Sequence, residues 1–326
     1  MMPYLAGAGV GLLGYLIWRF LKADADFTVQ AADLLYSQSK MKNSFRGKVV
    51  WITGASSGLG RALAVYLCQF GPKLILSARR KDELEKVKQE CLSINPDLSE
   101  DDVLVLPMDS LNFDKLPELV SAVTLKFEHI DILVNNAGRS QRSLAETTPV
   151  EVDRAVMELN LLGYVALTKA VLPSMIEQKS GCIVAVSSVA GKMGSPIGTA
   201  YSASKFAVMG FFNALRAEVY QHGIDVCTLC PGPTRSDISL HSFTETVEKE
   251  YNQDVKNEGN KLETERFARL AGVSIAARIP EAWISLQPYL LYLYLAQYFP
   301  SIVTSKVFLK GSQSRIQKFR AGECLY

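Results

Sequence analysis

The sequence predicts a single α/β domain with a doubly wound parallel sheet, and two patterns along the chain indicate it. Short, fully apolar runs recur, and stretches with helical periodicity fill every interval between them. Strands that are apolar on both faces are typical of a parallel sheet covered by helices on each side and joined by right-handed crossovers. With 326 residues the chain has room for one such core, since cores grow to roughly 250–300 residues before chains split.

We expect six strands in this sheet, with a helix between each strand and the next. They lie at residues 48–53, 73–77, 103–108, 130–135, 182–187 and 224–230. After Pro233 the periodicity lapses into a polar stretch that continues to residue 263. A stretch of that length is too long for an ordinary connection, so we interpret it as a functional loop or a disordered one.

The N-terminal residues form an apolar run that is just long enough to span a membrane. Residues 3–21 contain one charge, Arg19, and a helix needs about 20 apolar residues to cross a bilayer. Trp18 and Lys22 are the aromatic and basic residues expected at a membrane interface, and no basic residue precedes the run, as one would in a signal peptide. We therefore favour a retained membrane anchor over a cleaved signal peptide or a buried core helix.

Charge, cysteine and histidine content argue against several classes of protein. With 35 Lys and Arg against 33 Asp and Glu, the net charge is +2 and the basic residues are scattered, so nucleic acid is not an expected partner. The six cysteines lack the spacing of a disulfide framework. Cys227 and Cys230 form a C-x-x-C, but a strand places them on opposite faces, which favours core packing. His129, His222 and His241 are isolated, with nothing to place them beside carboxylates, so no metal site is expected.

A glycine-rich segment, TGASSGLG at residues 53–60, lies between the first expected strand and the first expected helix. In that position Gly54, Gly58 and Gly60 would let the pyrophosphate of a dinucleotide approach the backbone N–H groups at a helix N-terminus. A plain tight turn could use the same residues. The location directly after the first strand of an alternating chain favours nucleotide binding.

The end of the second expected strand indicates which dinucleotide is bound. An enzyme that uses NAD usually presents Asp or Glu there to the ribose hydroxyls. This chain instead presents Arg79 and Arg80, whose cations suit the 2′-phosphate of NADP(H). The alternative is a pair of solvated arginines at the start of the next helix. We therefore favour NADP(H) over NAD(H).

Tyr201 and Lys205 are four residues apart in YSASK, a spacing that places both side chains on one face of a helix. The spacing alone carries little information, because Tyr36 and Lys40 share it. Position discriminates between the two pairs. Only Tyr201 follows the end of a strand and opens a helix inside the alternating domain, where a side chain can reach a nicotinamide beyond the carboxyl ends of the strands.

Together these motifs make the chain resemble the short-chain dehydrogenase/reductase superfamily over residues 48–276. The motifs occur in the order typical of that family. They are TGASSGLG, Asp109 after the third strand, NNAG at residues 135–138, Asn160, Ser188, YSASK and PGPTRSD from Pro231. YSASKFAVMGFF and VSSVAGK resemble the microsomal hydroxysteroid dehydrogenase branch. The fold that this resemblance implies is a Rossmann-type sheet, with residues 233–263 as a substrate loop.

The resemblance also implies roles for four catalytic residues. Tyr201 would act as general acid in reduction and base in oxidation, while Lys205 would lower its pKa and bind the nicotinamide ribose. Ser188 would hydrogen-bond the substrate oxygen, with Ser187 as its rival for that role. Asn160 would complete a proton relay through water. Ser188 and Tyr201 would thus contact the substrate.

A larger set of residues would bind the cofactor at the carboxyl ends of the strands. Its members are Gly54, Ser56, Ser57, Gly58, Leu59, Gly60, Arg79, Arg80, Asp109, Asn136, Ala137, Gly138, Tyr201, Lys205, Pro231, Gly232 and Thr234. The expected function is NADP(H)-dependent interconversion of a carbonyl and an alcohol on a lipophilic substrate such as a steroid or retinoid. Two alternatives are a nucleotide-binding regulator without turnover and an NAD-dependent sugar epimerase or dehydratase.

The C-terminal tail favours an apolar ligand over a sugar, because residues 283–303 are rich in aromatics and leucines. Pro288 and Pro300 bracket a run too short to cross a bilayer. The tail could pack in the core, roof the substrate cleft, dip into the lipid interface or pair with a second subunit in a homodimer. The expected parts of the chain are an anchor at residues 1–22, a connector at 23–46, the catalytic domain at 47–280 and an apolar helical extension at 281–326.

Basic residues follow the N-terminal run and none precedes it, which predicts the membrane orientation. Arg19, Lys22, Lys40 and Lys42 lie on its C-terminal side. Because cytosolic flanks of membrane helices are enriched in Lys and Arg, the domain is expected to face the cytosol. The resemblance to microsomal enzymes implies the endoplasmic reticulum membrane.

Overall fold

The computed structural model describes residues 14–252 and 259–322 of the protein. The strands in these ranges form a seven-stranded sheet of order β3-β2-β1-β4-β5-β6-β7, in which every pairing is parallel. The strands are β1 (Val49–Thr53), β2 (Lys73–Ser77), β3 (Val103–Val105), β4 (Ile132–Asn135), β5 (Gly181–Val186), β6 (Ile224–Pro231) and β7 (Glu281–Ile284). Strand order reverses between β1 and β4, which is the crevice where open α/β sheets bind ligands.

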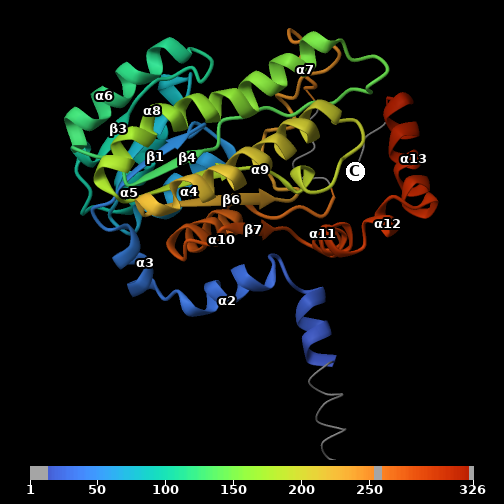
Figure 1. Ribbon diagram of the computed structural model, residues 1–326, viewed down its shortest axis with the longest axis horizontal. Helices are drawn as coiled ribbons and strands as arrows, with labels where there is room; N and C mark the ends of the chain where they lie inside the picture. The colour runs from blue at the N-terminus through green and yellow to red at the C-terminus, as the bar shows by residue number, and fades with distance from the viewer. Residues whose placement is uncertain (1–13, 253–258, 323–326) are drawn as a thin grey trace, which may run out of the picture.

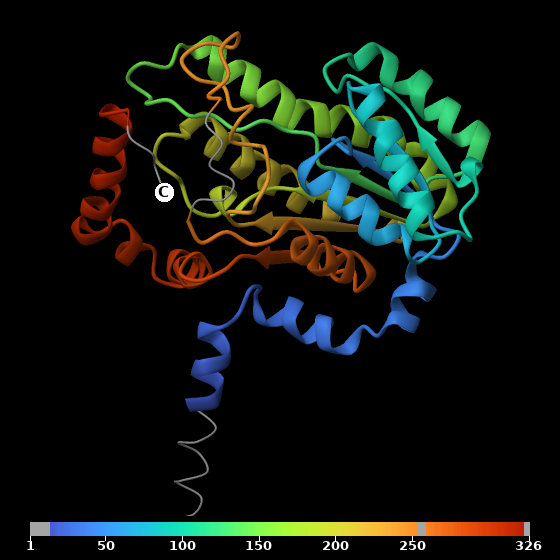
Figure 2. The same ribbon diagram turned by 180° about the vertical axis from the view of Figure 1, so that it is seen from behind.

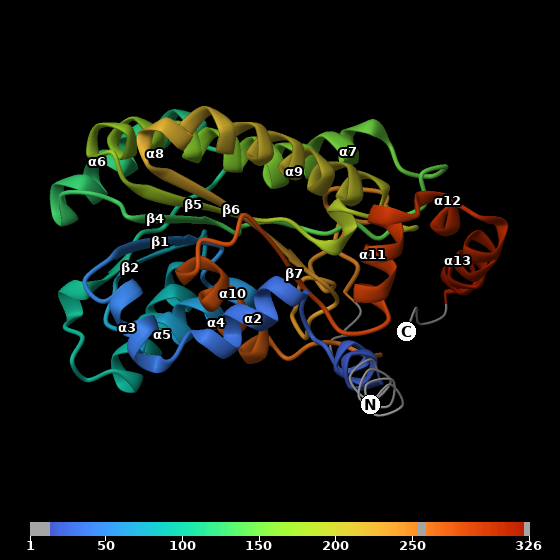
Figure 3. The same cartoon turned by 60° about the horizontal axis from the view of Figure 1, so that its bottom comes forward.

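Helices cover both faces of the sheet, as Figure 3 shows, with α6, α8 and α9 on one side and α4, α5 and α10 on the other. The helices are α2 (Phe27–Leu35), α3 (Gln38–Phe45), α4 (Gly58–Cys68), α5 (Lys81–Ile94), α6 (Leu116–Phe127), α7 (Val150–Met157), α8 (Gly163–Gln178), α9 (Thr199–Val219), α10 (Thr264–Ala276), α11 (Tyr289–Tyr298), α12 (Pro300–Val303) and α13 (Lys306–Arg320). The predicted doubly wound architecture is therefore confirmed.

Alternate residues of each strand enter two separate hydrophobic cores, which explains why the strands are apolar throughout. In β1, Val50 and Ile52 pack with α4 and α10, whereas Val49 and Trp51 pack with α6, α8 and α9. Trp51 is fully buried, and its indole N–H donates to the Ser77 hydroxyl over 2.8 Å. A buried indole is tolerated here because its one polar atom has a partner.

The six expected strands are present, and their ends differ from the predicted ones by at most three residues. The largest shift is in β3, which ends at Val105 instead of residue 108. A seventh strand, β7, was not predicted; it pairs with β6 and lies beyond residue 280, where the domain was expected to end. Only Ala282 and Ile284 of its four residues are buried, so this short edge strand gives almost no periodic signal.

Residues 23–46, expected to be a polar connector, instead carry α2 and α3 and cover the free edge of β7. Asp26 caps α2, accepting from the N–H groups of Thr28 and Val29, and its other carboxylate oxygen accepts from Trp283 N over 2.7 Å. The Asp26 N–H donates in turn to the Trp283 carbonyl over 2.9 Å. The sequence did not predict that this segment would pair with β7, because the partner of Asp26 lies more than 250 residues away in the chain.

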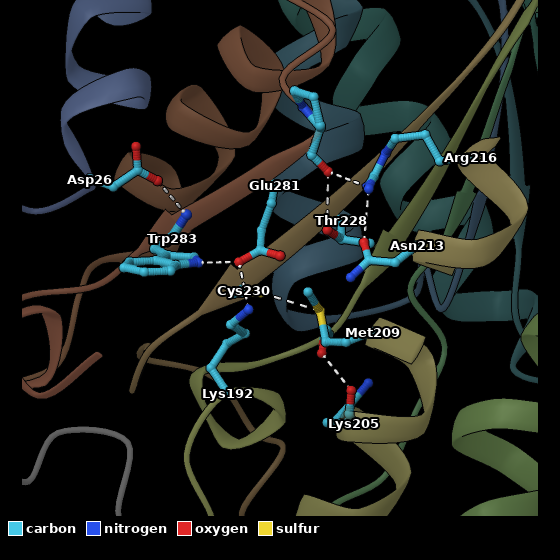
Figure 4. A network of polar contacts seen from close by, with 12 residues as sticks. Asp26, Lys192, Lys205, Met209, Asn213, Arg216, Thr228, Cys230, Glu281 and Trp283 are labelled. Carbon is cyan, nitrogen blue, oxygen red and sulfur yellow. Dashed lines mark hydrogen bonds and ion pairs between the residues drawn. The ribbon is translucent and has the colours of Figure 1, made fainter. Parts of the chain in front are cut away.

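Polar contacts extend from this edge to the turn that carries Ser188. The Trp283 indole N–H donates to the Glu281 carboxylate over 2.6 Å, and that carboxylate forms a 3.0 Å ion pair with Lys192 (Figure 4). Lys192 follows the one-turn helix Val189–Gly191, which begins directly after Ser188. The N-terminal arm therefore braces β7, and β7 braces the loop between Ser188 and α9.

Part of the expected anchor, residues 1–13, lies outside the described residues. Residues 14–21 are helical and project away from the domain, beside α11 (Figure 1, Figure 2). Among the described residues, one helix is long and apolar enough to cross a membrane, Val150–Gln178. The C-terminal half of this helix packs into the hydrophobic core through Leu167 and Val171. Its apolar composition is therefore that of a core helix of the domain.

Candidate active site

The glycine-rich segment folds into a tight loop between β1 and α4. Two structural requirements explain why residues 54, 58 and 60 are glycines. Gly54 and Gly58 have positive φ angles of 65° and 55°, a conformation that other residues adopt at a cost. A Cβ on Gly60 would collide with the carbonyl oxygen of Gly54, so this glycine lets α4 pack closely on β1. The loop leaves the N-terminus of α4 open, as a pyrophosphate site requires.

A cleft of about 1500 Å³ opens at the carboxyl ends of the strands, above this loop. The sequence-predicted residues that line it are Gly54, Ser56, Ser57, Gly58, Leu59, Arg79, Arg80, Asp109, Asn136, Ala137, Gly138, Ser188, Tyr201, Lys205, Pro231, Gly232 and Thr234. Gly60 and Asn160 do not line the cleft, because both lie behind its wall. One cavity therefore brings together residues that are up to 180 positions apart in the chain.

Tyr201 and Lys205 lie on the first turns of α9, where the Lys205 ammonium is 5.8 Å from the centre of the Tyr201 ring. Lys205 is buried and donates to the carbonyl of Val186 at the end of β5 over 2.9 Å. Burial lowers the pKa of Lys205 to about 7. Burial also raises the pKa of Tyr201, opposed by its hydrogen bond with Ser188 and the positive charge of Arg142. The site can therefore hold a proton on the phenol beside a titratable cation.

The two adjacent serines have different surroundings. Ser187 is buried and donates its hydroxyl proton to the Lys205 carbonyl over 3.0 Å, which ties β5 to α9. Ser188 is the partner of Tyr201, and its oxygen also accepts from the Ala190 N–H over 3.1 Å. Ser188 is thus the serine placed to share a ligand oxygen with Tyr201.

Asn160 lies in a π-helical turn, Glu158–Leu162, between α7 and α8. Its side-chain oxygen accepts from the N–H of Arg139 over 2.8 Å, and its NH₂ group donates to the Arg139 carbonyl and to the Ser204 hydroxyl. Both amide protons are therefore used within the protein. In this structure the side chain of Asn160 fixes the loop after β4, a contact that sequence spacing did not indicate.

Several predicted cofactor residues also support the loops around the cleft. Asn136 donates to the carbonyls of Thr53 and Gly54 over 2.8 and 3.3 Å, which joins the loops after β1 and β4. The Asp109 carboxylate accepts from the N–H of Leu111 over 3.0 Å and stabilises the turn after β3. A Cβ on Gly232 would collide with the Ser285 side chain, so this glycine lets β6 and the β7 end approach each other.

The arginine that begins α5 points back to the glycine-rich loop. Arg80 Nη2 lies 3.2 and 3.1 Å from the hydroxyl oxygens of Ser56 and Ser57. A cation and two hydroxyls on adjacent loops form a group of donors that can bind a phosphate. Arg79 is exposed at the same edge of the cleft.

Two histidines lie beside carboxylates, which corrects the expectation that nothing places them there. His241 Nδ1 is 2.8 Å from Glu250, whose other oxygen pairs with Arg139 over 2.8 Å, at the cleft. His129 is 3.1 Å from Asp131, at the opposite ends of the strands. Neither His–carboxylate pair belongs to a recognisable sequence motif, so the sequence did not indicate either of them.

The C-terminal tail supplies one wall of the cleft, through residues that the sequence analysis did not name. Tyr289 and Tyr292 come from α11, Val303 ends α12, and Leu309 and Ile316 come from α13, which also contributes the polar residues Ser312, Gln313 and Arg315. The tyrosines and aliphatic residues of this set line the cleft together with the loops after β4 and β5. Their aromatic and aliphatic composition was the signal available in the sequence.

The two C-x-x-C cysteines face opposite sides of the sheet, as expected. Cys227 Sγ is 3.8 Å from Cys182 Sγ in the core beneath α4 and α10. Cys230 Sγ instead contacts the Met209 sulfur of α9 over 3.6 Å. Both side chains are fully buried.

Comparison with known proteins identifies relatives among the short-chain dehydrogenases and reductases. The short chain dehydrogenase family model matches residues 48–247. Dehydrogenase/reductase SDR family member 7 of Mus musculus is 45% identical over 303 residues, which cover 93% of this chain and 88% of that protein. The Homo sapiens protein of the same name is 44% identical over 315 residues, with coverage of 95% and 91%.

Solved structures agree with the fold. A metagenomic short-chain oxidoreductase in complex with NADP has a TM-score of 0.54 and 32% identity, covering 59% of this chain and 85% of its own. A short-chain dehydrogenase from Streptomyces avermitilis has a TM-score of 0.67 and 26% identity, covering 86% and 99%. The resemblance read from the glycine-rich loop and the YSASK helix is therefore confirmed, and the chain belongs to the short-chain dehydrogenase/reductase family of oxidoreductases.

Proposed function

We propose that this protein is an NADP(H)-dependent oxidoreductase that interconverts a carbonyl and an alcohol on a lipophilic substrate of the steroid or retinoid kind. The observation that carries the proposal is the convergence of Tyr201, Ser188 and Lys205 in one cleft with the glycine-rich loop. A regulator without turnover would not need this set. A sugar epimerase is disfavoured by the aromatic and aliphatic residues that α11 and the end of α12 present to the cleft, Tyr289, Tyr292 and Val303.

The residues around the cleft fit a nicotinamide dinucleotide. The open N-terminus of α4 and the close-packed Gly54–Gly60 loop would receive the pyrophosphate, and Lys205 would bind the nicotinamide ribose. When bound, the cofactor supplies or accepts the hydride. The preference for NADP(H) is supported by the Arg80, Ser56 and Ser57 group and by the NADP carried by the metagenomic neighbour.

The residues of this chain would handle the proton. In reduction, Ser188 and Tyr201 would both hydrogen-bond the carbonyl oxygen, and the Tyr201 phenol would donate its proton as the oxygen gains charge. The nearby Lys205 ammonium would stabilise the phenolate that remains. Asn160 would hold the loop after β4 in position through its two bonds to Arg139.

Cofactor preference is testable through the two arginines. Replacing both Arg79 and Arg80 with Gln should raise the KM for NADPH by about 10-fold or more, because charge-assisted bonds to a phosphate are lost. The KM for NADH, which has no 2′-phosphate, should change by less than about twofold. The test is to measure the KM for NADPH and for NADH on the same preparations of wild type and of the double variant. An equal rise for both cofactors would show that these arginines act on the loop and not on the phosphate.

We also propose that the protein is bound to the endoplasmic reticulum membrane by residues 1–22, with the domain facing the cytosol. The helix at residues 14–21 supports this, because Tyr15, Ile17, Trp18 and Leu21 are each more than half exposed to solvent. Such a surface is costly in water and favourable in lipid.

Membrane topology can be measured on sealed microsomes that contain the full chain. We expect the protein to remain in the pellet after alkaline carbonate extraction and the domain to be digested by external protease without detergent. Release of the protein by carbonate would show that residues 1–22 do not anchor it in the membrane. Protection until detergent is added would reverse the orientation.

A further inference from the structure

Arg142 is a cation inside the catalytic cleft whose charge the surrounding protein does not neutralise. It is half-buried and lines the cleft. Its Nη1 group donates to the Ser140 hydroxyl and the Gln141 carbonyl over 3.1 and 2.9 Å, both of which are uncharged. In the part of the chain that the structure describes, no carboxylate forms an ion pair with it. A guanidinium that lines a ligand cleft and has no carboxylate partner among the described residues can bind an anionic group of a ligand.

The neighbouring arginine shows the contrast. Arg139 also lines the cleft, but Glu250 pairs with it over 2.8 Å and its guanidinium lies 4.5 Å from the centre of the Phe243 ring. Arg139 is therefore satisfied by the protein itself. Of these two cleft arginines, Arg142 is the one left to receive an anionic ligand.

The backbone around Arg142 is held rigidly against the helix that carries Tyr201. The Arg142 N–H donates to the Phe243 carbonyl over 2.8 Å. The preceding Gln141 is fully buried, and its side-chain oxygen accepts from the N–H of Ala200, the residue before Tyr201, over 2.9 Å. Because these bonds fix the backbone at Arg142 relative to α9, less conformational entropy is lost when a ligand binds to Arg142.

Gly198 shows how close the two groups are. A Cβ built on Gly198 would be 3.9 Å from both Arg142 Nη1 and Tyr201 Cβ, so the guanidinium and the Tyr201 side chain are neighbours on either side of this glycine. The charge of Arg142 also reaches the phenol, since it lowers the pKa of Tyr201 against the effect of burial.

From this geometry we propose that Arg142 is a specificity-determining residue that binds a carboxylate on the substrate, in the same cleft in which Tyr201 acts on the carbonyl. The proposal rests on the proposed carbonyl reduction at Tyr201 and narrows its substrate class. The aromatic and aliphatic residues of the C-terminal tail that line the cleft would hold the hydrocarbon part, and Arg142 would hold the acid group. The preferred substrates are therefore lipophilic oxo acids rather than fully apolar carbonyl compounds.

A matched pair of aldehydes tests the proposal on the full-length protein with NADPH. One is a para-formylbenzoate that carries a hexyloxy chain, and the other is its methyl ester, which has the same shape without the charge. We expect the wild-type kcat/KM to favour the acid by about 10- to 100-fold, as one charge-assisted pair can supply. Arg142→Gln should remove this preference by lowering kcat/KM for the acid while changing that for the ester less than about threefold.

The matched control is Arg154→Gln, which removes the same charge from an exposed position on α7 outside the cleft. It should leave the ratio between acid and ester unchanged. A wild-type ratio near one, an unchanged ratio in Arg142→Gln, or an equal loss for both substrates would each overturn the proposal.

A binding measurement separates this proposal from the proposed function. The corresponding hexyloxybenzoate without the formyl group cannot be reduced, and its affinity for the NADPH-bound protein can be measured by calorimetry. We expect about 10-fold weaker binding to Arg142→Gln than to wild type or Arg154→Gln. If this difference is present but neither aldehyde is turned over by wild type, the proposed function fails and the carboxylate site stands. If turnover occurs without the difference, the carboxylate site fails.

Discussion

Replacement of Tyr201 by Phe is expected to lower kcat for carbonyl reduction by about 10² to 10⁴-fold, the usual effect of losing a general acid. The substitution removes the transferable proton and keeps the ring against its neighbours. Lys205 retains its bond to the Val186 carbonyl, and the glycine-rich loop is unchanged. The affinity for NADPH, measured by fluorescence titration, should therefore stay within about threefold of wild type.

The control for this experiment is Tyr164→Phe. Tyr164 is a buried tyrosine whose ring lies 5.2 Å from the Lys205 ammonium, and its hydroxyl donates to the Val186 carbonyl over 3.3 Å, yet it does not line the cleft. It should retain most of the activity. Turnover above about one per cent of wild type in Tyr201→Phe would contradict the assignment of Tyr201 as the proton donor.

The activity is expected to fall as the pH rises through about 7, because burial lowers the pKa of Lys205 to about 7. Below that pH Lys205 is charged and stabilises the Tyr201 phenolate; above it the charge is lost. The value of kcat/KM for NADPH, which reports on the free enzyme, should be flat at acid pH and then fall by about tenfold per pH unit.

Deprotonation of Lys205 does not by itself destabilise the folded state, because its effect on stability has the opposite sign. An unfolded lysine titrates near ~10.4, so between about pH 7 and that value the unfolded chain holds a proton that the folded chain has lost. The contribution of Lys205 to the free energy of unfolding therefore rises with pH over that window. Thermal unfolding measured across the same pH range gives the check.

Two variants complete the test of Lys205. Lys205→Met should lower kcat/KM by about 10²-fold at pH 6, where the wild-type side chain is charged. Lys205→Arg keeps a cation that does not titrate in this range, so whatever activity it retains should not fall near pH 7. The same fall in Lys205→Arg as in wild type would assign the titration to another group.

The sequence alone predicted those features that depend on neighbours in the chain. Alternating apolar runs gave the strands, because a strand buried on both faces must be apolar throughout, as Val49 to Ile52 are. The spacing of Tyr201 and Lys205 gave their common side of α9, because helix geometry alone fixes it. The opposite orientations of Cys227 and Cys230 follow from the two-residue period of a strand in the same way.

Only the tertiary structure decided the features that depend on contacts between distant parts of the chain. The pairing of Arg139 with Glu250, which leaves Arg142 as the cation for a ligand, joins residues 111 positions apart. The seventh strand depends on β6 and on Asp26 to complete its edge, since its own four residues carry too little apolar surface to indicate it. The periodicity of apolar residues along the sequence does not predict such contacts, because these contacts form only when folding brings the distant partners together.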